Sequence, residues 1–239
     1  PRRPLMVIAA ALIAGLLAGL LLGHYGAAQK VGSVFKRVLG AKTSFLPPPD
    51  PIAMQLRQDR AAFFRASTAR ADVVMLGDSH SENGPWSELL AGHTVLNRGI
   101  GWDTTQDVAD RLDEVIARKP AVVFLLIGIV DLRYGNDPDA VADRIQAIAA
   151  HLRQAGIRTH VQSVLPVAAR LREPTNERVR RVNERLRSDP DFVDLHPVLV
   201  KDGALDARLT HDGVHLTPQA YTAWARHIEP ILRNRSGPG

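Results

Sequence analysis

A serine, a histidine and an aspartate in this chain have the types and the spacing that acyl transfer requires. Ser79 follows a glycine and an aspartate, while Asp212 and His215 lie three positions apart near the other end of the chain. A serine hydroxyl attacks an acyl carbon well when a histidine takes its proton and a carboxylate holds the other ring nitrogen of that histidine. Ser79, His215 and Asp212 are therefore the candidate nucleophile, base and orienting carboxylate.

An apolar run directly before Ser79 predicts where the nucleophile lies. Residues 71–76 have the pattern of a buried strand, and Gly77 ends it. We therefore expect Ser79 at a strand-to-helix turn, where backbone N–H groups point outward and favour negative charge.

Three further blocks accompany the serine in a fixed order. The four blocks are Gly77-Asp78-Ser79 followed by Glu82, Trp86, Ser87 and Glu88; Asn97-Arg98-Gly99-Ile100-Gly101 continuing into Asp103-Thr104-Thr105; Gly128-Ile129-Val130-Asp131; and Asp212 with His215. Together they resemble the SGNH (GDSL) family of serine esterases and lipases over residues 51–239. The first block looks like that of bacterial relatives of platelet-activating-factor acetylhydrolase.

The resemblance implies an oxyanion hole with three donors: the amide of the nucleophile, the amide of the glycine in the second block, and an asparagine side chain in the third. By position these are Ser79, Gly99 and Val130. Val130 has no polar group and is not expected to donate, and loss of one donor typically costs about 10² to 10³ in turnover. We therefore leave the third oxyanion donor unassigned. The polar candidates nearby in the sequence are Asn83, Asn97, Asn136 and Thr104.

The roles of the residues next to the motifs are less specific to the family than those of the motif residues. His80 is expected to face solvent on the first helical turn, although the Gly-Asp-Ser-His form also resembles SGNH domains attached to some polysaccharide O-acetyltransferases. We expect Asp78 to bond backbone amides around the turn. Trp86 and Trp102 follow the first two blocks and are candidates either for lining the pocket or for aromatic packing.

Composition excludes several classes of function. The net charge is +5, but residues 1–45 hold six Lys and Arg and no acidic residue, which leaves the rest of the chain close to neutral. This distribution favours an anionic membrane surface as a partner over nucleic acid. The chain has no cysteine. His211, Asp212 and His215 match no helical metal-binding pattern, so no metal or cofactor is expected.

An uncharged apolar segment at residues 4–23 predicts a transmembrane helix, because about 20 apolar residues span a bilayer. The alternative is a signal peptide cleaved after residue 28. Small residues recur every fourth position and are compatible with a homodimer of packed anchors, at Ala11, Gly15, Gly19 and Gly23. Residues 1–28 are thus assigned as an anchor or signal peptide.

Residues 29–50 form the expected connection to the catalytic domain. Apolar residues at helical spacing between 31 and 39, with four basic residues between 30 and 42, predict an amphipathic helix on lipid headgroups, and a proline-rich spacer follows at 46–51. We expect the domain to lie outside the cytoplasm, because an anchor followed by a tether is typical of an exported enzyme. The larger number of basic residues after the apolar segment favours the opposite orientation.

The remaining chain alternates helix and strand signals. Expected helices span 52–66, 103–118 with Asp103 as N-cap, 137–155, 174–188 and 217–232; expected strands span 72–76, 94–96, 121–127, 158–165 and 192–195. Strands separated by helices imply a parallel sheet with both faces covered, here a three-layer α/β/α flavodoxin-like sandwich with a five-stranded parallel sheet. Ligands bind beyond the carboxyl ends of such strands, where Ser79, Gly99 and Gly128 all fall.

We therefore expect a membrane-tethered serine esterase that acts on small acyl esters, acetyl esters above all. Two alternatives are an O-acetyltransferase on an envelope polysaccharide and a non-catalytic carbohydrate-binding or scaffold protein, for which Val130 is the main argument.

Overall fold

The computed structural model describes residues 49–171 and 174–233. The expected anchor, the amphipathic segment and the first half of the proline-rich spacer, residues 46–48, lie outside these residues. Within them, no helix combines the length and hydropathy that crossing a bilayer requires.

The described residues form one five-stranded parallel sheet with the strand order β2-β1-β3-β4-β5. The strands are β1 (Val73–Gly77), β2 (Val95–Gly99), β3 (Val122–Leu126), β4 (Arg158–Gln162) and β5 (Phe192–Val193). Every residue of β1 and β3 is buried, as the apolar, mostly branched composition of these central strands predicts. The five-stranded parallel sheet and its flavodoxin-like order are confirmed.

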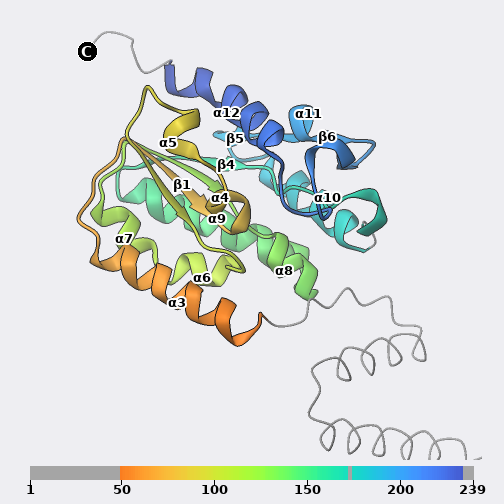
Figure 1. Ribbon diagram of the computed structural model, residues 1–239, viewed down its shortest axis with the longest axis horizontal. Helices are drawn as coiled ribbons and strands as arrows, with labels where there is room; N and C mark the ends of the chain where they lie inside the picture. Colours follow the sequence, from red (N-terminus) through yellow and green to blue (C-terminus); the bar gives the residue numbers. More distant parts are fainter. Residues whose placement is uncertain (1–48, 172–173, 234–239) are drawn as a thin grey trace, which may run out of the picture. The chain divides into compact units, whose positions relative to one another are not determined.

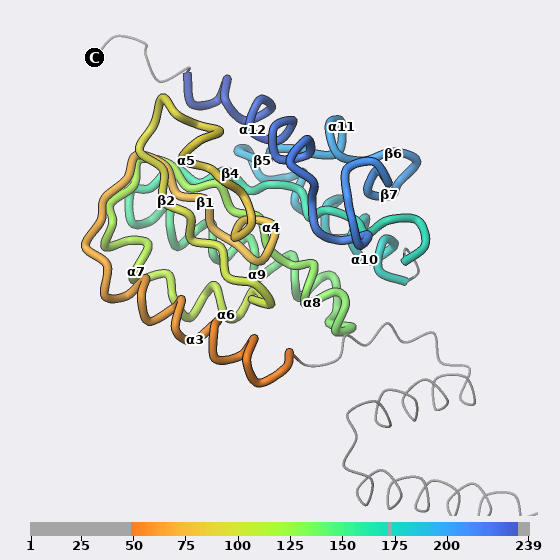
Figure 2. The backbone as a smooth tube through the Cα atoms, in the orientation of Figure 1, coloured from red at the N-terminus to blue at the C-terminus, as the bar shows by residue number. Residues whose placement is uncertain are grey.

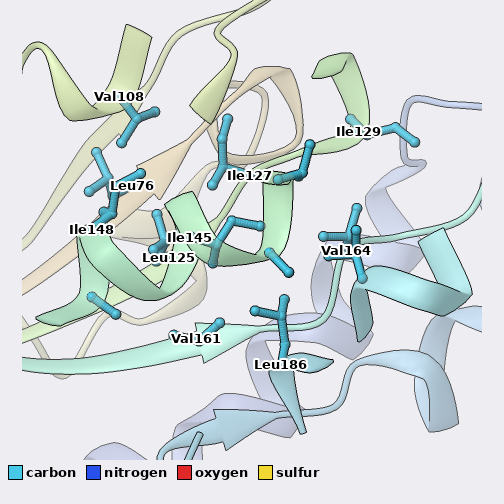
Figure 3. Close-up of a cluster of buried hydrophobic side chains, with 14 of the residues drawn as sticks. Leu76, Val108, Leu125, Ile127, Ile129, Ile145, Ile148, Val161, Val164 and Leu186 are labelled. Carbon is cyan, nitrogen blue, oxygen red and sulfur yellow. The ribbon is translucent and has the colours of Figure 1, made fainter. Parts of the chain in front are cut away.

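Helices on one face of the sheet enclose the larger apolar cluster, whose branched side chains interdigitate in Figure 3. Leu76 and Leu125 of the central strands meet Ile145 and Ile148 of the longest helix on this face. The helices are α6 (Thr105–Ala109), α7 (Leu112–Ala117), α8 (Ile129–Tyr134), α9 (Pro138–Gln154) and α10 (Thr175–Leu186).

The opposite face is covered by a second cluster with an aromatic centre. Trp86, Tyr221 and Trp224 pack together there, with the two tryptophan ring centroids 4.8 Å apart. The helices on this face are α5 (Trp86–Leu89), α11 (His196–Leu199) and α12 (Pro218–Arg233), and a short antiparallel pair, β6 (Val200–Lys201) with β7 (Ala204–Leu205), lies beside them (Figure 1). The sheet between two helical layers is the expected three-layer sandwich.

The first described helix, α3 (Pro51–Ala66), lies alongside α6 and α7 in the tube view (Figure 2). Arg57 on α3 reaches Asp103 and Asp107 at the start of α6, while Arg118 at the end of α7 donates to the carbonyl of Ser67. The helix that follows the linker is therefore part of the same domain as the sheet.

Three local predictions need correction. The helix expected from Asp103 to Arg118 is two short helices, and its N-cap is Thr104, which forms a capping box with Asp107. The chain breaks between the two helices next to Arg111, whose side chain turns inward to bind buried oxygens, Asp103 Oδ2 among them. Helix α8 was not expected, and the fourth strand ends at Gln162, three residues early.

Candidate active site

Ser79, His215 and Asp212 form a continuous hydrogen-bonded chain. The Oγ of Ser79 lies 3.1 Å from Nε2 of His215, and Nδ1 of His215 lies 2.6 Å from Oδ2 of Asp212. A carboxylate only accepts, so Nδ1 carries the proton and Nε2 is left to accept from the serine hydroxyl. The three residues that the sequence selects are thus brought together across 136 positions, in the order that proton removal from a serine requires.

Ser79 begins the short helix α4 (Ser79–Glu82) directly beyond β1. Asp78 caps this helix by accepting from the amide of His80 at 2.9 Å, which agrees with its expected structural role. A Cβ at Gly77 would lie 1.9 Å from the carbonyl oxygen of Leu126 on the neighbouring strand. Glycine at this position lets the turn pass close to β3 and points the serine out of the sheet.

The loop that carries Asp212 and His215 is fixed by its own backbone. Oδ1 of Asp212 accepts from the amides of Val214 and His215, both at 2.8 Å. Partial burial alone would raise the pKa of Asp212, but its hydrogen bonds from the His215 ring and these amides hold that pKa well below its usual range. Gly213 turns the chain with a φ of +98°, a conformation that glycine adopts without strain. The carboxylate is therefore charged and oriented before any substrate arrives.

His80 does not face solvent, contrary to the sequence-based expectation. Its side chain is 1% exposed, with Nε2 2.9 Å from the carbonyl oxygen of Val214 and Nδ1 3.2 Å from Oδ1 of Asp78. Burial disfavours the charged ring, but Asp78 and the Val214 carbonyl outweigh it and raise the pKa of His80. The nucleophile helix and the His215 loop are thus joined through a buried imidazole.

A cavity of about 300 Å³ opens above Ser79. Its lining residues come from α3, α4, the loop after β2, helix α8 and the His215 loop: Ala53, Leu56, Arg57, Arg60, Ser79, Glu82, Asn83, Ile100, Gly101, Trp102, Ile129, Val130, Arg133, Val214 and His215. Trp102 lines this pocket, whereas Trp86 is buried in the aromatic cluster and donates its indole N–H to the carbonyl of Ser81 at 2.7 Å. Trp86 therefore packs the core, and Trp102 faces the site.

Gly99 is not among the residues that line the pocket. Its amide donates to Oδ1 of Asn97 at 2.9 Å, and a Cβ there would lie 2.1 Å from the amide nitrogen of Glu82. Glycine is thus needed for close packing of β2 against α4, and its N–H is already engaged. The amide of Gly101 donates to the Glu82 carboxylate. Trp102 has a φ of +68°, and in residues 49–171 and 174–233 its amide has no hydrogen-bond acceptor.

Val130 lies at the pocket with an exposed fraction of 6%, and its side chain belongs to the apolar cluster. It offers no donor, as expected. Three of the four residues considered as a replacement oxyanion donor are engaged elsewhere. Asn97 donates to the carbonyls of Glu82 and Gly84. Asn136 donates to Asp131, and Thr104 belongs to its capping box. Asn83 is the candidate that lines the pocket.

A buried ion network supports the loop after β2. Oδ2 of Asp103 accepts from Nε of Arg111 at 2.9 Å, and its Oδ1 accepts from Arg57 at 2.9 Å. Arg111 also donates to the carbonyl oxygens of Gly77 and Arg98, at 3.2 and 2.9 Å. One guanidinium thus ties the end of β1, the end of β2 and the pocket loop together. The sequence shows these charged residues, but no spacing or motif in it predicts that Asp103, Arg111 and Arg57 are in contact.

The GDSL-like Lipase/Acylhydrolase family model matches residues 69–223. The chain belongs to this family. Among curated proteins it is 31% identical over 176 residues to platelet-activating factor acetylhydrolase IB subunit alpha1 of Bos taurus, covering 67% of this chain and 75% of that one. The protein is an ester hydrolase, as the motifs predict.

Solved structures with lower identity share the fold. A GDSL-like lipase from Bacteroides thetaiotaomicron has a TM-score of 0.58 and 23% identity, with 77% of this chain and 98% of that one covered. An acetylxylan esterase from Geobacillus stearothermophilus has a TM-score of 0.55 and 18% identity, covering 72% of this chain and 97% of that one. The hydrolase thus has the sandwich of other members of the family.

Proposed function

We propose that this hydrolase is a serine esterase in which Ser79 is the nucleophile, His215 the general base and Asp212 the orienting carboxylate. The observation that carries the proposal is the contact of 3.1 Å between Ser79 and His215. The Oγ–H proton passes to Nε2 as Oγ bonds to the acyl carbon, and His215 then gives this proton to the departing alcohol oxygen. Water, deprotonated by His215, releases the acid from the acyl-serine.

The oxyanion is stabilised by backbone donors in this proposal. The amide of Ser79 lies at the first turn of α4. Trp102 lines the pocket, and its amide has no acceptor in the described residues, so these two amides are assigned the role. Gly99, the donor implied by family position, already donates to Asn97. Val130 leaves the third donor missing, which favours slow turnover.

Small acyl esters, acetyl esters above all, are the proposed substrates. The pocket volume of about 300 Å³ is near the lower end of ligand sites, and Ile129 and Val130 among its lining residues belong to the packed core. The relative named above is called an acetylhydrolase. A long acyl chain would need a longer apolar channel than this lining offers.

Residues 1–48 are proposed to tether the enzyme to a membrane, with its catalytic domain outside the cytoplasm. The uncharged segment 4–23 is the main support. A second support is the apolar surface of α3, the helix that follows the linker, where Ile52, Leu56 and Phe63 are 73, 64 and 69% exposed. Exposed apolar side chains of this size favour contact with lipid or with another apolar surface.

The two alternatives have less support. His80 suggested acyl transfer to a sugar, but its ring is 1% exposed and is bound to the carbonyl oxygen of Val214, so it is not free to contact a sugar. A non-catalytic role gives no reason for an aligned triad. Acyl transfer to sugar in excess of hydrolysis would favour the transferase. Glycan binding unaffected by Ser79→Ala, without an acyl-enzyme, would favour the binding protein.

The test is p-nitrophenyl acetate turnover by the full chain in detergent. Ser79→Ala and His215→Ala should each reduce turnover to the solution background, while His211→Ala, a change at an exposed neighbouring histidine, should leave it within about twofold. Loss of activity in all three variants would indicate a damaged loop. Turnover unaffected by Ser79→Ala would overturn the serine mechanism.

A further inference from the structure

The pocket is lined by three arginines, two of which have carboxylate partners. Nη2 of Arg57 lies 2.9 Å from Asp103 Oδ1 and 3.3 Å from Asp107 Oδ2. Nε of Arg60 lies 3.3 Å from Oε1 of Glu82. These two guanidinium groups are neutralised before substrate binds, so they add little net charge to the cavity.

The third arginine, Arg133, differs from both. It lines the same cavity from α8 and is partly buried, yet in the part of the chain that the structure describes it makes no hydrogen bond and has no carboxylate within 4.0 Å. Desolvation lowers its pKa, and the more distant negative charge of Asp212 offsets this only in part. A guanidinium stays charged at neutral pH. The cavity therefore holds a partly desolvated cation with all its donors available, which is unfavourable until an anion binds.

The place of Arg133 and the proposed acyl group together indicate which part of a substrate it meets. Arg133 lies three residues after Val130 on α8, so both are on neighbouring turns of one helix face. Both residues line the cavity above Ser79. The acetyl group, which is the proposed acyl portion, carries no charge. An anion that Arg133 binds is therefore on the alcohol portion of the ester.

We propose that Arg133 binds a carboxylate or phosphate group on the alcohol portion of the ester, so that the enzyme selects anionic esters over neutral ones. The inference rests on the proposed serine esterase function and names its substrate class. The other residues of α8 that line the pocket, Ile129 and Val130, are apolar, so the guanidinium is the main polar group that this helix presents to the cavity. Arginine also suits both anions, because its donors match two oxygens at once.

The test compares two acetyl esters that differ in one charge, 3-acetoxybenzoate and 3-acetoxybenzamide. The wild-type full chain should hydrolyse the carboxylate with a kcat/KM at least about tenfold higher, mainly through KM, and the preference should shrink as salt is added. Arg133→Gln should remove the preference by raising KM for the benzoate about tenfold, while kcat/KM for the benzamide stays within about threefold. Arg133→Lys should keep part of the preference.

A matched control removes an arginine outside the pocket. Arg65 on α3 is exposed, and Arg65→Gln should leave both substrates unchanged. Equal loss on both esters in Arg133→Gln, or a wild type that hydrolyses the two equally well, would overturn the inference and leave the esterase proposal intact. Failure of the esterase proposal is distinct, because neither ester would then show turnover that depends on Ser79.

Discussion

The imidazole of His80 lies 2.9 Å from the carbonyl oxygen of Val214, and this contact joins the helix that carries the nucleophile to the loop that carries the base. Ser79 is adjacent to His80 in the chain, and His215 is adjacent to Val214. The distance between the two reacting side chains therefore depends on a buried residue that takes no part in the chemistry. The Tyr221 hydroxyl, which donates to the His80 carbonyl at 3.0 Å, holds the same segment from α12.

His80→Gln should reduce both activity and stability. Because the folded-state pKa of His80 is raised, the charged ring contributes stability that is fully present below its ordinary pKa of about 6.5 and is lost as pH rises through the folded value. The difference in unfolding free energy between wild type and His80→Gln should thus be largest near about pH 5.5 and shrink toward about pH 9. Urea unfolding at both pH values measures it.

His211→Gln is the control for this experiment, because His211 is exposed in the same loop as His215. It should show no such pH dependence. A difference for His80→Gln that is constant with pH would mean that folding does not change the pKa of this ring, and a difference that grows toward about pH 9 would mean that the ring is neutral in the folded protein.

Val130→Asn should raise kcat on p-nitrophenyl acetate about tenfold, because it places an amide donor where the pocket has none. Stability should fall by about 1 to 3 kcal/mol, since Val130 is 6% exposed and packs in the apolar cluster. Val130→Leu supplies no donor and should give no gain. Steady-state kinetics with thermal unfolding separates the two effects.

No gain in Val130→Asn would mean that another group already fills the position. Asn83 is the candidate to examine, because its side chain lines the pocket. In that case Asn83→Ala should lower kcat about 100-fold, whereas with an empty third position it should change kcat by less than about threefold.

Trp102→Gly should keep kcat within about threefold, because a backbone donor survives any change of side chain. The indole lines the pocket, so KM should rise. Trp102 has a φ of +68°, which costs a non-glycine residue about 1 kcal/mol or more, so glycine should also offset part of the stability lost with the ring. A kcat that falls about 100-fold with KM unchanged would contradict the assignment.

The sequence predicted the parallel sheet and the contact between Asp212 and His215 for physical reasons that are local. Apolar runs such as 121–127 and 71–76 mark buried strands, and the parallel topology then follows from the helices between them. Asp212 and His215 share one short loop, so their spacing alone predicts contact. These features depend on periodicity and on neighbours in the chain.

The features that the sequence did not predict depend on long-range contacts. Helix α8 follows β3 without a polar interruption, so one apolar run spans strand and helix, with only Ile127 and Gly128 between them. The buried ring of His80 contacts the carbonyl oxygen of Val214, which is 134 positions away in the chain. The Gly99 amide is engaged by the side chain of Asn97, and this contact depends on how the fold orients that side chain. For His80 and Gly99, burial and hydrogen-bond partners are therefore set by the fold and not by neighbours in the chain.

Asp103→Asn should destabilise the domain by about 3 to 5 kcal/mol, because it removes the buried negative charge that Arg111 and Arg57 share. Asp103 is 3% exposed as a side chain and binds Arg111 and Arg57, both at 2.9 Å. Activity should fall with stability, since Arg111 also holds the carbonyl of Gly77 beside the nucleophile. Urea unfolding measures the stability, and kcat/KM at low temperature reports on the folded fraction.

The pair Arg208 and Asp206 provides the comparison for that change. Its atoms approach to 2.6 Å, but Arg208 is 79% exposed, so solvent screens the pair and Asp206→Asn should cost far less stability than Asp103→Asn. Similar losses for Asp103→Asn and Asp206→Asn would show that the buried network adds no stability. A stable Asp103→Asn variant with reduced kcat would instead assign the network to positioning the Trp102 loop, because Asp103 directly follows the proposed oxyanion donor.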